Sequence, residues 1–164
     1  MIYLDSAAIV KLVHTEPESA ALDLWLAEHI GMPRVSSAIA EIEVPRAILR
    51  CAPTKQARIP MVMGTVARVE IDIAVRTLAA SYKNPLLRSL DAIHLATAQL
   101  LATEMGESPA AFVTYDKWLL EAATAAGLPT ASPGAAGLAV SVAVAIWDED
   151  PGYREGEAGA AGTR

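Results

Sequence analysis

The sequence predicts an α/β domain with a mainly parallel sheet, and two observations lead to this fold class. Short β-type runs alternate with helical stretches along the first 133 residues, a pattern typical of helices packed on a parallel sheet. The chain has 164 residues and is 53% hydrophobic but only 5% aromatic. It is therefore long enough for one domain, with a core built mainly from Ala, Val, Leu and Ile.

The expected strands are short β-type runs. They lie at residues 2–4, 34–36, 69–73, 111–115 and 128–131. The expected helices have apolar side chains at helical spacing. They span residues 6–13, 18–29, 38–51, 54–67, 73–83, 89–104 and 117–126.

Local signals place the ends of several of these helices. Ser37 and Asp72 are residue types that cap helix N-termini, and Gly127 is typical of a helix C-terminus. Pro45 lies inside the helix at 38–51 and lacks a backbone donor, so we expect a kink there.

The composition changes after Pro133, so we expect a domain at 1–133 followed by an extension at 134–164. Most of the extension is rich in Gly, Ala and Glu, which is typical of disorder. The apolar run 138–147 is the exception, and it is open to three interpretations: an added strand, a docking segment or a partner site. It is too short to span a bilayer.

Charge and cysteine content restrict the class of protein. The net charge is −6, so a broad basic surface for nucleic acid is not expected, and binding to a polyanion would need a local patch or a bound cation. The single cysteine excludes an internal disulfide. Together with the lack of a signal peptide, this favours a protein of the reducing cytoplasm.

Two of the expected strands are followed by aspartate, Asp5 and Asp116. Ligands of parallel α/β sheets bind at the carboxyl ends of the strands, so both carboxylates are candidates for one crevice. The alternative is that each simply caps the following helix.

Two further carboxylates lie on expected helices. Glu43 shares a helix face with Arg46, and it is either a surface partner of that arginine or a crevice residue. Asp91 lies on a helix that is apolar nearly all round, where an unpaired carboxylate is costly. It either pairs with His94 at i,i+3 or binds a cation. A shared Mg²⁺ or Mn²⁺ would relieve the repulsion among four such carboxylates.

The motifs that carry these acids together resemble a PIN-domain nuclease, in particular a VapC-type toxin of a bacterial toxin–antitoxin pair. The motifs are M-I-Y-L-D-S at 1–6, V-S-S-A-I-A-E-I-E-V-P-R-A at 35–47, L-R-S-L-D-A-I-H-L-A-T-A at 87–98 and V-T-Y-D-K-W-L at 113–119. The resemblance covers about residues 1–133. Pro45, two residues after Glu43, departs from the family's pattern.

The resemblance implies a three-layer α/β/α fold and a metal-dependent ribonuclease that hydrolyses RNA phosphodiester bonds at an Mg²⁺ or Mn²⁺ site. The implied catalytic and metal-binding acids are Asp5, Glu43, Asp91 and Asp116. Ser6 and Thr114 match the hydroxyl positions beside the first and last acids, where they support the metal ligands. Possible contacts to the RNA backbone are Lys11, Arg46, Arg50 and Lys117.

The implied partners are RNA, a VapB-like antitoxin encoded nearby and a second copy of the chain in a homodimer, with no membrane involved. The antitoxin is expected to fill a groove between the early helices, with Trp25 and Leu26 among the groove residues. Two alternatives stand beside this interpretation. One is a non-catalytic module that binds metal or antitoxin. The other is an Asp-dependent phosphoryl-transfer domain, which Ala7 disfavours because that chemistry calls for a second aspartate there.

Overall fold

The computed structural model describes residues 1–135, and residues 136–164 lie outside the described part. The strands are β1 (Ile2–Leu4), β2 (Arg34–Ser37), β3 (Ala67–Val69), β4 (Ala111–Val113) and β5 (Thr130–Ala131). The α-helices are α1 (Ser6–Val13), α2 (Ser19–Glu28), α3 (Ala40–Cys51), α4 (Ile59–Met63), α5 (Ile73–Ser81), α6 (Ser89–Met105) and α7 (Lys117–Ala125). A 3-10 helix, η1 (Pro53–Arg58), precedes α4.

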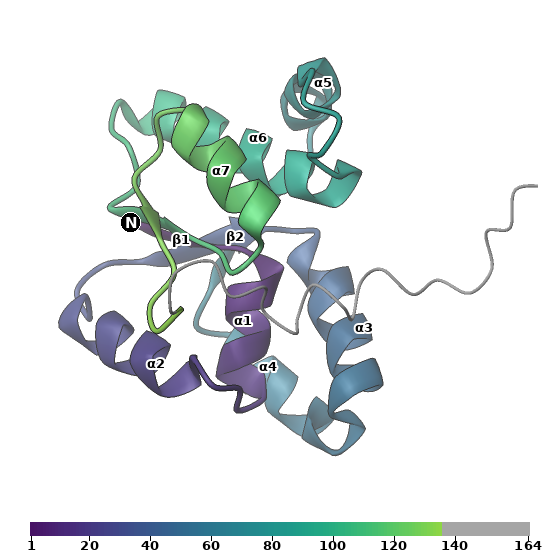
Figure 1. Ribbon diagram of the computed structural model, residues 1–164, viewed down its shortest axis with the longest axis vertical. Helices are drawn as coiled ribbons and strands as arrows, with labels where there is room; N and C mark the ends of the chain where they lie inside the picture. The colour runs from purple at the N-terminus through teal and green to yellow at the C-terminus, as the bar shows by residue number, and fades with distance from the viewer. Residues whose placement is uncertain (136–164) are drawn as a thin grey trace, which may run out of the picture.

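The strands form one sheet in the order β3-β2-β1-β4-β5, and every neighbouring pair is parallel. Figure 1 shows α5, α6 and α7 on one face of this sheet and α1 to α4 on the other. The predicted three-layer α/β/α architecture is therefore confirmed. Because β1 and β4 are adjacent and parallel, the residues that follow them meet at the same edge of the sheet.

The two central strands, β1 and its neighbour β4, are buried on both faces, as expected for a sheet covered by helices on either side. Ile2 and Leu4 of β1 pack into the core beneath α1, α2 and α3. Tyr3 points the opposite way and stacks on Phe112 of β4, with 5.0 Å between ring centroids and 6° between ring planes. Tyr3 and Phe112 belong to the second core cluster, with residues of α6 and α7.

The segment between α3 and α5 differs from the prediction. The expected helix at 54–67 is instead η1 followed by the short α4, and the expected strand at 69–73 is β3, which covers Ala67–Val69. Pro60 accounts for part of this difference. It has no backbone donor, so it is tolerated in the first turn of a helix, and α4 begins next to it at Ile59.

Of the three predicted helix caps, Asp72 and Gly127 are confirmed and Ser37 is wrong. Ser37 is the last residue of β2 and α3 begins at Ala40, so its prediction as an N-cap is wrong. Asp72 does cap α5, because its Oδ1 accepts a hydrogen bond from Val75 N at 2.9 Å. Gly127 follows α7 with φ of +80°, the left-handed conformation that favours glycine after a helix.

The longest described helix, α6, is buried over much of its first half, as its apolar sequence predicts. Ala92, Leu95, Ala96 and Ala98 are all at most 6% exposed. The helix ends at Gly106, which has φ of +70°. Within residues 1–135, none of the helices is long and apolar enough to cross a membrane. The apolar run 138–147 lies outside the described residues.

Candidate active site

Asp5 links the two central strands at the edge where they end. It follows β1 and caps α1, with Oδ1 accepting a hydrogen bond from Ala8 N at 2.7 Å. Its other oxygen, Oδ2, accepts from Thr114 Oγ1 at 2.5 Å. Thr114 comes immediately after β4, so this bond joins the ends of β1 and β4.

Asp116 repeats the arrangement at the start of α7. Its Oδ1 accepts from Leu119 N at 2.8 Å and caps the helix, while Oδ2 accepts from an Arg88 terminal nitrogen at 2.7 Å. Its backbone N–H donates to Thr114 Oγ1 at 3.1 Å. The capping and crevice interpretations of Asp5 and Asp116 therefore both hold, because one oxygen caps a helix and the other has a separate partner.

Glu43 lies in the first turn of α3 and is only 7% exposed. Its Oε2 accepts from Ser6 Oγ at 2.6 Å and lies 2.9 Å from His94 Nε2. The interpretation of Glu43 as a surface partner of Arg46 is therefore wrong. Helix α3 continues past Pro45 to Cys51, and Glu43 still faces the crevice.

Asp91 lies in the first turn of α6 and is 8% exposed. Its Oδ2 accepts from Arg88 Nε at 2.9 Å, and the positive end of the helix dipole also favours its charge. The alternative pairing with His94 is wrong, because His94 bonds to Glu43 and Ser6 instead.

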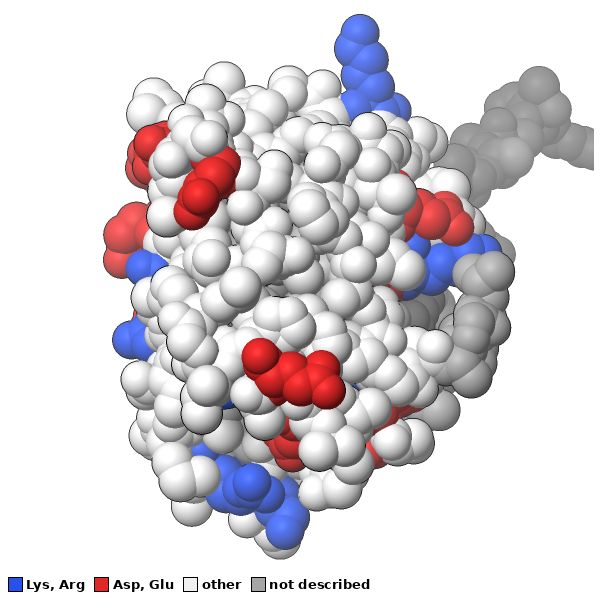
Figure 2. Space-filling model, turned by 90° about the vertical axis from the view of Figure 1, so that its left-hand side faces the viewer, with Lys and Arg blue, Asp and Glu red and all other residues white. Residues whose placement is uncertain are grey.

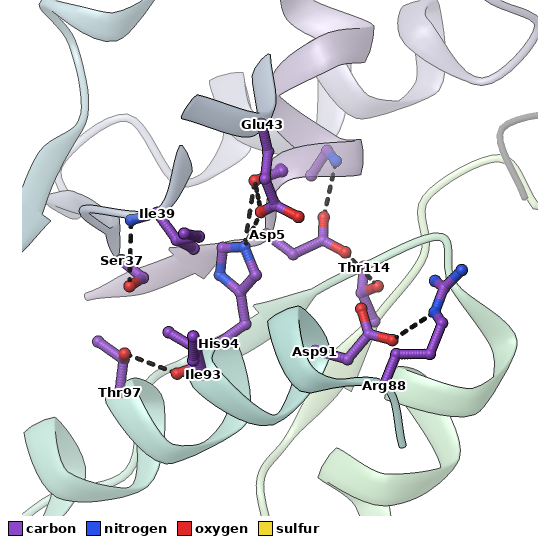
Figure 3. A network of polar contacts seen from close by, with 12 residues as sticks. Asp5, Ser37, Ile39, Glu43, Arg88, Asp91, Ile93, His94, Thr97 and Thr114 are labelled. Carbon is purple, nitrogen blue, oxygen red and sulfur yellow. Dashed lines mark hydrogen bonds and ion pairs between the residues drawn. The ribbon is translucent and has the colours of Figure 1, made fainter. Parts of the chain in front are cut away.

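These side chains line one pocket with a cavity volume of about 180 Å³. Figure 3 shows Glu43, Asp5 and Asp91 converging from α3, from the end of β1 and from α6. The lining residues are Asp5, Ser6, Ala7, Glu43, Arg88, Ser89, Leu90, Asp91, His94, Tyr115 and Asp116. The structure therefore brings together all four acids that the sequence singles out.

A buried chain of hydrogen bonds supports Glu43 from behind. Tyr3 Oη lies 3.0 Å from His94 Nδ1, and His94 Nε2 faces Glu43. Because a carboxylate oxygen can only accept, Nε2 carries the hydrogen, and in the neutral ring Nδ1 accepts from the tyrosine hydroxyl. Burial raises the pKa of Tyr3 well above its usual range, which keeps that hydroxyl protonated.

Burial also changes the carboxylates themselves. It raises the pKa of Asp5 to about 6, against the lowering effects of His94 and of the hydrogen bonds from Thr114 and Ala8. Burial raises the pKa of Asp91 as well, opposed by its ion pair with Arg88. The pocket therefore holds carboxylates whose charged forms are costly without a counter-charge.

The donor set fits a hard divalent cation, because carboxylate oxygens are the ligands that Mg²⁺ and Mn²⁺ prefer. In the described part of the chain, no three His, Cys, Asp or Glu side chains are arranged closely enough to share an ion. The Arg88 guanidinium, however, already bridges Asp91 and Asp116 as a cation. A positive charge is thus accommodated between two of the four acids.

The four basic residues expected to contact RNA are not equivalent. Lys11 is 2% exposed, forms ion pairs with Glu16 and Glu18 and lies over the Tyr115 ring. Its placement does not fit a contact with RNA. Arg46 and Arg50 are exposed on α3, and Lys117 is exposed at the start of α7.

Sequence reasoning missed two residues of this site. Arg88 lies three residues before Asp91, a spacing that signals an ion pair, but its bond to Asp116 across 28 residues is visible only in the fold. The sequence offers His94 only as an alternative partner of Asp91, whereas the side chain is buried and bonded to Glu43. Its contact with a site carboxylate carried no local signal.

Comparison with known proteins adds independent information. The family model described as the PIN domain matches residues 2–124. Ribonuclease VapC35 of Mycobacterium tuberculosis is 47% identical over 137 residues, which cover 83% of this chain and 99% of that protein. Ribonuclease VapC46 of the same species is 41% identical over 132 residues, covering 80% of this chain and 97% of that protein.

Two solved structures share the fold at low sequence identity. A toxin-antitoxin complex from Klebsiella pneumoniae aligns with a TM-score of 0.58 at 20% identity, covering 81% of this chain and 98% of its own. The crystal structure of FitAcB from Neisseria gonorrhoeae aligns with a TM-score of 0.57 at 21% identity, covering 83% and 100%. These two matches support the architecture described above.

Proposed function

The chain belongs to the PIN-domain family, and from this premise we propose that it is a metal-dependent endoribonuclease, the toxin of a toxin–antitoxin pair. One observation carries the proposal: four buried carboxylates from four separate elements line a single pocket at the carboxyl ends of the central strands. The relatives named as VapC ribonucleases support RNA as the substrate.

In this proposal Asp5, Glu43, Asp91 and Asp116 hold the cation. Bound there, Mg²⁺ or Mn²⁺ supplies a Lewis acid that lowers the pKa of water and stabilises charge on the phosphate and the leaving oxygen. The hydroxyls of Ser6 and Thr114 donate to Glu43 and Asp5 and fix the direction of their remaining lone pairs.

The pocket also contains a group that can move a proton. Either Asp91 or Asp116 takes a proton from the attacking water as its oxygen bonds to phosphorus. The bond between phosphorus and the 3′ oxygen then breaks and the leaving oxygen takes a proton from water, so the products carry a 5′-phosphate and a 3′-hydroxyl. A raised pKa suits Asp91 to this role, because a carboxylate with a higher pKa is a stronger base and accepts the proton of water more readily.

RNA is expected to approach along α3 and the start of α7, where Arg46, Arg50 and Lys117 are exposed. Phosphate contacts of this kind position a nucleic acid without reading its sequence. Figure 2 shows a different face, the side from which β1 starts in Figure 1, and there charged side chains are sparse and of both signs. That face offers no basic track for a polyanion.

The antitoxin is expected to cover apolar side chains that the described part of the chain leaves exposed. Leu24 on α2, Leu49 on α3 and Met61 on α4 are 70%, 57% and 65% exposed, and these helices lie on the same face of the sheet (Figure 1). The expected role of Leu26 is wrong, because it is 2% exposed and packs in the core. Trp25 is half-buried.

We further propose that the protein acts in the cytoplasm and as a homodimer, as its resemblance to the family implies. Co-expression with a candidate antitoxin tests the proposed partner. The protein should co-purify with that partner, and Leu49→Glu should weaken the complex while leaving the fold intact, because Leu49 is largely exposed.

The decisive experiment is cleavage of total bacterial RNA by the purified protein in Mn²⁺ or Mg²⁺, compared with EDTA. Asp91→Asn removes the charge of one pocket carboxylate and nearly keeps its shape. Asp23→Asn is the matched control, because Asp23 is an exposed carboxylate on α2. We expect discrete fragments that need the metal, persist with Asp23→Asn and disappear with Asp91→Asn.

Two other outcomes would change the conclusion. A folded wild-type protein that binds Mn²⁺ but never cleaves RNA would favour the non-catalytic module. Cleavage that survives both EDTA and Asp91→Asn would contradict the acidic site as the catalytic centre, whatever the family.

A further inference from the structure

The Arg88 guanidinium lies between the carboxylates of Asp91 and Asp116, whose charges repel each other unless a cation is present. The residue precedes α6 and is its N-cap. Its Nε donates to Asp91 Oδ2 at 2.9 Å, and one terminal nitrogen donates to Asp116 Oδ2 at 2.7 Å. One guanidinium thus joins the carboxylates of α6 and α7 across the pocket.

The partner atoms make this bridge more than a surface ion pair. Asp116 uses Oδ1 to cap α7, so Oδ2 is the oxygen directed toward Arg88. The side chains of Asp91 and Asp116 are only 12% and 9% exposed. At such sites, two close carboxylates repel strongly unless a cation lies between them.

Arg88 itself is not buried. Its side chain is 39% exposed, and the residue lines the pocket. A partly exposed arginine can turn its charged end into water at modest cost, because the long side chain remains hydrated. The bridge is therefore built from two fixed acids and one movable cation.

We infer that Arg88 is a built-in counter-cation that competes with the divalent ion for Asp91 and Asp116. When no ion is present, the guanidinium neutralises the two acids. When an ion enters, Arg88 releases both Oδ2 atoms. This inference rests on the proposed metal site and adds to it a regulation of metal affinity by the chain's own residue.

The competition follows from charge and geometry. A divalent ion carries twice the charge of a guanidinium and bonds directly to carboxylate oxygens. Two cations held against the same pair of oxygens repel each other at short range in a partly buried site. Removing Arg88 should therefore make the metal-free pocket less stable and the metal-bound pocket easier to form.

The test is calorimetric titration of the metal-free protein with Mn²⁺ alone, comparing wild type with Arg88→Gln. We expect Arg88→Gln to bind Mn²⁺ about tenfold more tightly, equivalent to about 1.4 kcal/mol. Arg68→Gln is the matched control. Arg68 also donates through Nε to a carboxylate, that of Glu41 at 2.8 Å, but outside the pocket lining. The Arg68→Gln variant should therefore bind Mn²⁺ with the same affinity as wild type.

A second readout and a second variant keep the test independent of folding failure. Without metal, Arg88→Gln should melt at a lower temperature than wild type, and Mn²⁺ should raise its melting temperature by more. Arg88→Lys keeps one charge but lacks the fork that reaches two carboxylates, so its affinity should lie between those of the other two proteins.

The outcomes separate this inference from the proposed function. Equal or weaker Mn²⁺ binding by Arg88→Gln and Arg88→Lys, with clear binding by wild type, would overturn the counter-cation role and leave the metal site standing. No binding by any folded variant would overturn both. Binding that is tighter only when Arg88 is changed would support the competition.

Discussion

The substitution Asp5→Asn measures how much the buried charge of Asp5 lowers the free energy of unfolding. Asp5 is 3% exposed, and burial raises its pKa from the ordinary 3.8 of an aspartate to about 6. Asparagine has nearly the same shape and is an equally good helix N-cap, but it cannot ionise. The variant therefore removes the cost of a buried charge while keeping the cap of α1.

The sign of the effect follows from proton linkage. Between about pH 4 and pH 6 the folded protein binds more protons at Asp5 than the unfolded chain, so stability falls as pH rises through this window. Above it the full difference of about two pH units applies, and at about 1.4 kcal/mol per unit this is about 3 kcal/mol. Asp5→Asn should gain most of that amount relative to wild type at pH 7.5 and little at pH 4.

The assay is urea unfolding of metal-free protein at several pH values between 4 and 7.5. Asp72→Asn is the control, because Asp72 caps α5 through Oδ1 in the same way but is exposed. The quantity of interest is the change with pH in the stability difference between each variant and wild type. A constant difference would refute the argument, since altered packing or hydrogen bonding at Asp5 does not titrate.

Three further predictions concern single side chains. Thr114→Val removes the hydroxyl that donates to Asp5 and should lower the free energy of unfolding by about 1 to 3 kcal/mol in urea titrations; an unchanged value would mean that the bond contributes nothing. Lys11→Met should leave RNA affinity and its salt dependence unchanged in filter binding, because Lys11 is buried in ion pairs; a lower salt slope would restore it as an RNA contact. Phe112→Ala should cost about 3 to 5 kcal/mol of stability, because Phe112 is fully buried and stacked on Tyr3, and a loss below 1 kcal/mol would contradict that packing.

The parts of the fold that sequence predicted are those with a local signal. Helix α6 is marked by its continuous apolar surface and ends at a glycine with positive φ. The ends of β1 and β4 are marked by aspartates that cap the next helix. Periodicity and capping act within a few residues, so they can be read without knowing the fold.

The parts that were missed depend on contacts between distant segments. Lys11 has an ordinary position in α1, and its burial arises because Glu16 and Glu18 in the following segment lie against it. Arg88 is an ordinary neighbour of Asp91 until β4 brings Asp116 beside it. Neither contact has a sequence pattern of its own.

The buried link from Tyr3 through His94 to Glu43 has a consequence for protein engineering. It joins β1, α6 and α3 by side chains that are all buried. Transplanting the L-D-A-I-H segment of α6 into another scaffold would transfer Asp91 but leave His94 without its hydrogen-bond partners. The two ring nitrogens of His94 bond to Tyr3 of β1 and Glu43 of α3. The transferable unit is three elements rather than one motif, and homologous recombination between distant relatives should succeed only at crossovers that keep β1, α3 and α6 from the same parent.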